Sequence, residues 1–219
     1  MMEIYEMSLR ELDSGLRAGA FSLKEMFESL VNRIEAREKV TQAFIELDID
    51  RVRHQIDQIN SRDRATRISG IPFGVKDIFN TKDWVTSYGS SIFEGYQPWC
   101  DAAVVSQLRS AGGVVMGKTV TTEFAYFFPG KTRNPHHPDH TPGGSSQGSA
   151  AAVADFMVPF AIGSQTAASV IRPAAFCGVV GYKASAGQFP LNGALTLSYS
   201  MDSLGFFVRS VEDLQLLRN

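Results

Sequence analysis

The chain has 219 residues, of which 44% are hydrophobic and 20% charged, and its net charge is −2 at pH 7. This balance is ordinary for a globular protein and provides no basic field for binding nucleic acid. No apolar run is long enough to span a membrane, and the polar start MMEIYEMSLRELDSG is not typical of a signal peptide. The two cysteines, Cys100 and Cys177, are too few for a disulfide framework, so we expect buried or partly buried thiols and a cytoplasmic protein.

The N-terminal region, residues 1–63, has the pattern of a mainly helical segment. Ser-x-x-Glu capping boxes begin at Ser8 and at Ser22, and apolar residues at helical spacing follow each of them. Such apolar stripes are more typical of core packing than of a binding surface. The expected elements are a helix over 5–20, a second helix from 22, a strand over 41–48 and a charged helix over 48–63.

A short apolar segment, IPFGV, lies between Gly70 and Lys76 and predicts a buried strand that ends at the lysine. A lysine beside Asp77 is usually one half of a surface ion pair. The apolar residues on both sides also allow a buried lysine, whose pKa falls because burial penalises its charged form. The segment alone leaves both alternatives open, a surface ion pair and a neutral catalytic base.

The middle of the chain alternates between helices and strands. Asp101 can cap a helix over 102–111, a Gly-Gly pair ends that helix, and VVMG then predicts a strand. The same order returns around 150–163, which favours an α/β architecture with a partly parallel central sheet. Residues 118–130 are expected to form a loop that leads into a helix.

The loop KTRNPHHPDH, residues 131–140, is rich in residue types that bind metals, but their spacing is poor for a metal site. Its candidate ligands lie next to one another on a segment interrupted by prolines, so they rarely converge on one ion. We therefore expect a surface loop without a metal. The candidate ligands are His136, His137, Asp139 and His140.

The segment from Pro142 to Gly187 is dominated by small residues in its first half. A flexible linker is one interpretation, but the apolar run AAAVADFMVPFAIG within it predicts an ordered helix and strand. It contributes Ser145 and Ser169, and no histidine of the chain is placed like the base of a triad. A serine can instead be activated by a neutral lysine such as Lys76, with a second hydroxyl relaying the proton.

Three separated motifs now carry a specific resemblance: GIPFGVKDIF, PGGSSQGSAAAVA and QTAASVIRPAAFCGVVGYK. Together, in this order, they resemble the amidase signature family of serine amidohydrolases, and the resemblance covers about residues 70–210. It implies an α/β/α sandwich with a mixed central sheet. The whole chain, 1–219, then corresponds to a single but partial domain that looks truncated at its C-terminus, since members of the family are generally much longer.

The resemblance also implies roles for individual residues. Ser169 corresponds to the nucleophile, Lys76 to the general base, and Ser145 to a bridge between them that follows a cis Gly144–Ser145 peptide. The implied reaction is hydrolysis of a carboxamide through an acyl-enzyme, without metal or organic cofactor. The implied oxyanion hole consists of the backbone amides of Thr166, Ala167, Ala168 and Ser169, and the implied substrate-binding residues are Phe124, Ala125 and Gly144.

Several positions depart from the family pattern. Ala168 stands where glycine is usual, which costs stability if the position needs a positive φ, and Gln165 replaces a common aspartate. KASAG lacks the usual proline after Lys183. Arg172 follows Ser-Val-Ile, which resembles simple amidases more than the amidase subunits of tRNA-dependent amidotransferases.

Two interpretations of function remain. One is an active amidase for a small-molecule amide, with no nucleic-acid or membrane partner. The other is an inactive or partner-dependent amidase fragment, which folds as a homo-oligomer, with a complementing C-terminal chain, or as a subunit of an amidotransferase-like complex. A nucleotide-binding fold is disfavoured, because neither GxxxxGK[ST] nor GxGxxG occurs.

Overall fold

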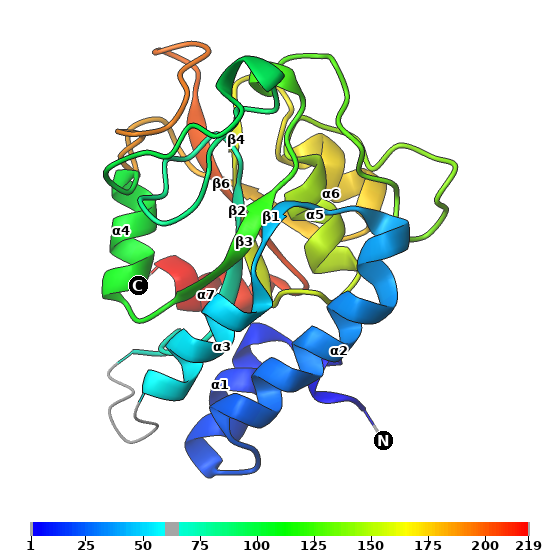
Figure 1. Cartoon of the computed structure of the whole chain (residues 1–219), viewed down its shortest axis with the longest axis vertical. Coiled ribbons are helices and arrows are strands. Elements are labelled where there is room, and N and C mark those ends of the chain that lie inside the picture. Colours follow the sequence, from blue (N-terminus) through cyan, green and yellow to red (C-terminus); the bar gives the residue numbers. More distant parts are fainter. Residues whose placement is uncertain (1, 60–65, 219) are drawn as a thin grey trace.

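The computed structural model describes residues 2–59 and 66–218, which form a mixed α/β fold around one six-stranded sheet (Figure 1). The strand order is β1-β3-β2-β4-β6-β5. β2 is parallel to both β3 and β4, and the outer pairs β1–β3, β4–β6 and β6–β5 are antiparallel. The strands are β1 (Phe44–Leu47), β2 (Pro72–Lys76), β3 (Val114–Thr119), β4 (Phe160–Gln165), β5 (Val180–Lys183) and β6 (Ser203–Val208).

Helices cover both faces of this sheet, as expected for an α/β/α arrangement. α5 and α6 pack on one face, α4 and α7 lie on the other, and α1 to α3 form a group at one end (Figure 1). None of the helices in the described part of the chain is both long and apolar enough to span a membrane. The helices are α1 (Leu9–Ala18), α2 (Leu23–Thr41), α3 (Ile49–Gln58), α4 (Ala103–Ser110), α5 (Gln147–Ala154), α6 (Ile171–Cys177) and α7 (Val211–Arg218).

Both predicted capping boxes are present at the N-termini of α1 and α2. Ser8 and Ser22 each accept a hydrogen bond from the amide three residues on, and the glutamate there binds back. α1 is shorter than expected, because a 3-10 turn, η1 (Ile4–Glu6), precedes it and Gly19 ends it with φ 68°. The charged helix expected over 48–63 is α3, which ends at Gln58, and residues 60–63 lie outside the described residues.

Three sequence expectations were wrong in detail. α2 continues through Thr41, so the strand expected over 41–48 starts only at Phe44. Asp101 does not cap α4: the residue at that position is Ala102, and the Asp101 carboxylate accepts the Lys82 amide at 2.9 Å instead. The helix expected within 118–130 is only the short 3-10 turn η4 (Glu123–Ala125).

The parallel strands β2 and β4 place the site. Both are almost entirely buried, and the rings of Phe73 and Phe160 stack between them with centroids 5.1 Å apart. Carboxyl ends of parallel neighbours meet at the same edge of a sheet. Lys76, the last residue of β2, and Gln165, the last residue of β4, therefore end at the same edge.

Candidate active site

Lys76 is fully buried at the end of β2 and contacts two hydroxyl groups. Its Nζ lies 2.7 Å from Ser145 Oγ and 3.0 Å from Ser164 Oγ. Burial lowers the pKa of Lys76 to about 7, and the negative charge of Asp202 opposes this shift. Of the two alternatives that the sequence left open, the surface ion pair is therefore wrong, and the buried lysine is observed.

The carboxylate that follows Lys76 in the chain pairs with a different lysine. Asp77 directly follows β2 and reaches a lysine on the face of the sheet opposite to Lys76, because Lys118 is paired with Val75 and not with Lys76. Its carboxylate lies 3.0 Å from Nζ of Lys118, which is buried in the adjacent strand β3. The two buried lysines thus lie on opposite faces of the sheet, and it is Lys118 that is paired with a carboxylate.

Ser145 lies just before α5 and is fully buried. The Gly144–Ser145 peptide is cis, as the resemblance implied. The carbonyl of Ser145 accepts the Thr122 amide at 3.1 Å, and the carbonyl of Gly144 accepts Nε of Arg172 at 2.9 Å. These two contacts fix the backbone that presents the Ser145 hydroxyl to Lys76.

Ser169 lies in the turn between β4 and α6, and its backbone is next to that of Ser146. The Ser146 amide donates to the Ser169 carbonyl at 3.3 Å, which brings this turn beside the residue that contacts Lys76. Ser169 is half-buried, and its hydroxyl makes no hydrogen bond with a protein group in the described part of the chain. The structure therefore places all three residues expected for the triad at one edge of the sheet.

The turn before Ser169 exposes unused backbone donors. Among the hydrogen bonds of residues 2–59 and 66–218, none is donated by the amides of Ala167, Ala168 or Ser169. Ala168 is not among the residues with positive φ, so alanine causes no left-handed strain there and the expected cost of replacing glycine does not arise. Oε1 of Gln165 accepts the amides of Val170 and Ile171 at 2.9 and 3.0 Å, so this side chain caps the start of α6.

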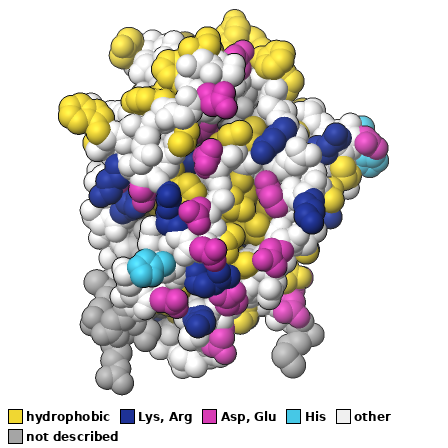
Figure 2. All heavy atoms as spheres, viewed as in Figure 1, with side chains coloured by type: hydrophobic (Ala, Val, Ile, Leu, Met, Phe, Trp, Pro, Cys, Tyr) yellow, Lys and Arg dark blue, Asp and Glu magenta, His cyan; other side chains and the backbone are white. Residues whose placement is uncertain are grey.

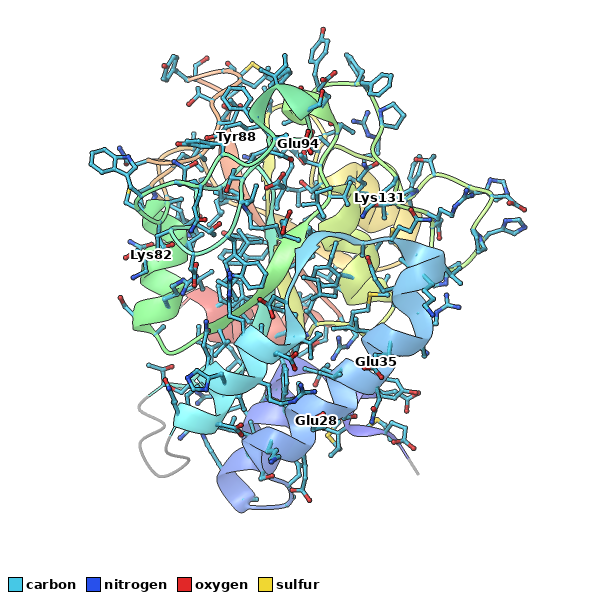
Figure 3. All side chains as sticks on the ribbon, in the orientation of Figure 1. Glu28, Glu35, Lys82, Tyr88, Glu94 and Lys131 are labelled. Atoms are coloured by element: carbon cyan, nitrogen blue, oxygen red, sulfur yellow. The ribbon has the colours of Figure 1, made fainter. Side chains whose placement is uncertain are left out.

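Phe124 and Ala125 form a turn with positive φ values of 49° and 57°. The Phe124 amide donates to the Tyr88 carbonyl at 2.8 Å, and the Phe124 ring packs 6.2 Å from Phe93 in an aromatic cluster. Tyr88, labelled in Figure 3, belongs to that cluster. Of these two residues, Ala125 lines the cavity of about 100 Å³ that adjoins the site, whereas Phe124 does not line it.

Two residues of this site were missed by the sequence analysis. Ser164 lies in β4 and contacts Lys76, and Asp202 precedes β6 and accepts a hydrogen bond from the Thr166 hydroxyl. A polar residue near the end of an otherwise apolar strand was the available signal for Ser164. Asp202 is distant in sequence, and only the antiparallel pairing of β4 with β6 brings it to the site.

The His-rich loop adopts an irregular structure away from this site. The ring of His136 is hydrogen-bonded to the Cys177 carbonyl at 2.8 Å, and the rings of His137 and His140 lie 4.4 Å apart. Within the described residues, no three His, Cys, Asp or Glu side chains gather as metal ligands would. That the loop binds no metal stays a prediction.

Comparison with known proteins identifies the family. The family model described as Amidase matches residues 25–219. The chain belongs to the amidase family. Among solved structures, one described as a crystal structure of amidase is 33% identical with a TM-score of 0.88, covering 97% of this chain and 51% of that one. The native peptide amidase of Stenotrophomonas maltophilia is 35% identical with a TM-score of 0.86, covering 95% of this chain and 46% of that one.

Curated relatives carry a different name. One subunit of the glutamyl-tRNA(Gln) amidotransferase of Halothermothrix orenii is 38% identical over 100% of this chain and 46% of its own length. The corresponding subunit from Natranaerobius thermophilus is 39% identical over 98% of this chain and 46% of its own length. The chain thus spans about half the length of the curated relatives it matches. Because relatives of both kinds are similar, the preference for simple amidases drawn from Arg172 stays a prediction.

Proposed function

We propose that this protein is an amidase that hydrolyses the C–N bond of a small-molecule carboxamide through an acyl-enzyme on Ser169. The observation that carries the proposal is the fully buried Lys76, whose Nζ lies 2.7 Å from Ser145 Oγ. A lysine with a pKa of about 7 is partly neutral at physiological pH and can accept a proton.

The reaction uses these groups in two half-reactions. Neutral Lys76 takes a proton from Ser145 while Ser145 takes one from Ser169, and Ser169 Oγ forms a bond with the carbonyl carbon. The tetrahedral intermediate then expels the amine, which receives the proton from the ammonium group through Ser145. Water next attacks the carbonyl carbon of the acyl-enzyme while its proton passes through Ser145 to Lys76. This second half-reaction releases the carboxylic acid and returns the proton to Ser169.

Backbone donors stabilise the charge that develops on the carbonyl oxygen. The amides of the Thr166–Ser169 turn fill this role in the proposal, because those of Ala167, Ala168 and Ser169 are free of other protein acceptors in the described part of the chain. Ala125 borders the acyl group, since it lines the adjoining cavity together with Ser164 and Thr166. Phe124 belongs to the same turn as Ala125, and its ring packs against Phe93.

A partner-dependent subunit is the second candidate, favoured by the amidotransferase relatives and by apolar side chains around the site. Tyr126 and Phe127 line a hollow of about 210 Å³ with Gly144, and Tyr199, which is 97% exposed, lines the cavity beside Ser164. Figure 2 shows hydrophobic side chains, in yellow, gathered at the top of the molecule in that view. Exposed apolar groups of this kind mark interaction surfaces, which here suit a complementing amidase chain or a second copy.

The proposed location is the cytoplasm. Cys100 and Cys177 are free thiols, as proteins of a reducing compartment commonly have, although Cys100 is exposed and only Cys177 is buried as expected. The substrate in this proposal is a small carboxamide, and no nucleic acid is bound by this chain itself.

Labelling with a fluorophosphonate probe tests the proposal directly. We expect the probe to modify one serine, which peptide mass spectrometry identifies as Ser169, and ammonia release from a panel of carboxamides to accompany it. Ser169→Ala should abolish both signals, whereas Ser185→Ala, a change in an exposed loop, should leave them intact. A folded wild-type protein that takes no label, alone or with an added amidase partner, would overturn the proposal.

A further inference from the structure

The turn that carries Ser169 is held at both ends by side chains that the proposed mechanism does not use. After the turn, Oε1 of Gln165 accepts two amides at the start of α6. Before the turn, the hydroxyl of Thr166 donates a hydrogen bond to Oδ1 of Asp202. Because Thr166 follows β4 directly and lies three residues before Ser169, this bond fixes where the turn starts.

The same carboxylate also fixes the opposite wall of the cavity. Oδ2 of Asp202 accepts the amides of Leu197 and Ser198 at 2.8 and 2.9 Å. Asp202 immediately precedes β6, and its neighbour Ser203 is paired with Gln165 across the sheet. Asp202 therefore connects the loop that lines the cavity to the turn that carries Ser169.

Charge gives Asp202 a second role. When Lys76 takes a proton, a positive charge appears at a fully buried position, and such a charge is costly without a negative partner. Gln165, at the end of the adjacent strand, is neutral. Asp202 is the group whose negative charge acts on Lys76 and raises its pKa against the effect of burial.

Other groups around Lys76 do not provide this charge. β4 and the start of α5 contribute only the hydroxyls of Ser164 and Ser145. Asp77, which follows β2, is paired with Lys118 of β3 on the other face of the sheet. This leaves Asp202, from the loop before β6, to balance the ammonium group.

We propose that Asp202 is a positioning residue for the amidase reaction. Its carboxylate holds the Ser169 turn through Thr166, and its charge stabilises Lys76 in the ammonium form that follows proton transfer. The inference rests on the proposed function, since it assumes that Lys76 takes the proton from Ser169 through Ser145.

Two substitutions separate the two roles. Thr166→Val removes the hydroxyl but keeps the carboxylate, so we expect the rate of fluorophosphonate labelling to fall about tenfold, within the range of one lost positioning contact. The pH midpoint of labelling should stay where it is in the wild type. Asp202→Asn removes the charge, so the pKa of Lys76 falls and the acid limb of the pH profile should move down by about one unit. Its plateau rate should fall as well.

Controls distinguish this inference from a loss of fold or of function. Asp139→Asn, in the exposed His-rich loop, should change neither the rate nor the midpoint. The titration of Lys76 is also followed without catalysis, by NMR of ¹³C-labelled lysine, with the Lys76 signal assigned from its absence in Lys76→Met. In Asp202→Asn the pH midpoint of that signal should move down whether or not the probe labels the wild type. A shifted midpoint in a protein that is never labelled would mean that the proposed function is wrong and that the effect of Asp202 on Lys76 is real.

Two results would overturn the inference. An unchanged Lys76 midpoint in folded Asp202→Asn would show that its charge does not act on the base. Labelling rates within twofold of the wild type in both folded variants would show that the Thr166–Asp202 bond does not position the turn.

Discussion

Lys118 and Asp77 form a fully buried ion pair of 3.0 Å on the face of the sheet opposite to the contacts of Lys76. Burial lowers the pKa of Lys118, and the carboxylate of Asp77 acts in the opposite direction. Asp77 also accepts the amide and the hydroxyl of Ser87, at 3.0 and 2.6 Å from Oδ2. The pair therefore ties the loop after β2 to β3, directly beside the site.

Breaking this pair should destabilise the protein strongly. Asp77→Asn leaves the buried ammonium of Lys118 without its charged partner, and such a change costs about 3–5 kcal/mol of unfolding free energy. Urea denaturation followed by circular dichroism measures the loss. Arg53→Gln, which removes the partly exposed pairs with Glu28 and Asp50, is the control and should destabilise the protein much less than Asp77→Asn. Equal losses in the two variants would contradict this interpretation.

Ser164 should orient the base. A neutral amine has two N–H donors and one lone pair, so an N–H donated to Ser164 Oγ at 3.0 Å leaves the lone pair free to face Ser145. We expect Ser164→Ala to lower the plateau rate of labelling about tenfold and to move the acid limb to lower pH, because the ammonium form loses an acceptor. Ser164→Thr keeps the hydroxyl and should restore most of the rate. A threonine variant as slow as the alanine variant would indicate a packing defect instead.

The sequence predicted the strand that ends at Lys76, because its apolar run is bounded by glycine, and the turns that carry Ser145 and Ser169, because small residues allow the tight backbone conformations of turns. It could not predict the partner of Asp77, since Lys118 becomes its neighbour only when β2 and β3 pair. The same reason explains why Asp202 was missed. The cap expected at Asp101 failed because a long-range partner, the Lys82 amide, competes for its carboxylate. Elements set by the local sequence could therefore be predicted, whereas contacts that depend on strand pairing could not.

Lys76 should control the pH dependence of acylation. With a pKa of about 7, the neutral form required for proton transfer is lost as the pH falls below that value, so the labelling rate should drop about tenfold per unit there. Lys76→Ala should slow labelling at pH 8 by at least about 100-fold, the usual contribution of a general base. Rates measured from pH 5 to 9 test both points. Undiminished labelling of Ser169 in Lys76→Ala would refute the lysine-base mechanism.

The buried Lys76 should also leave a signature in stability. Its pKa is lowered from 10.5 to about 7 on folding, so between these values the unfolded chain binds a proton that the folded protein does not. The unfolding free energy contributed by this group therefore rises with pH across that window, by about 1.4 kcal/mol per unit, and is flat below it. Lys76→Met removes the titrating group while keeping a side chain of similar length.

The difference between wild type and Lys76→Met isolates this term from Lys118, whose pKa is lowered in the same direction in both proteins. Urea denaturation at pH 7.5, 8.5 and 9.5 should show Lys76→Met to be the more stable protein at pH 7.5, with an advantage that shrinks toward pH 9.5. The advantage shrinks because folding of the wild type requires Lys76 to lose a proton. The free energy of that loss falls as the pH approaches the pKa of the lysine in the unfolded chain. A difference that stays constant over this range would mean that Lys76 keeps its ordinary pKa in the folded protein, and a lysine that is always charged could not serve as the base.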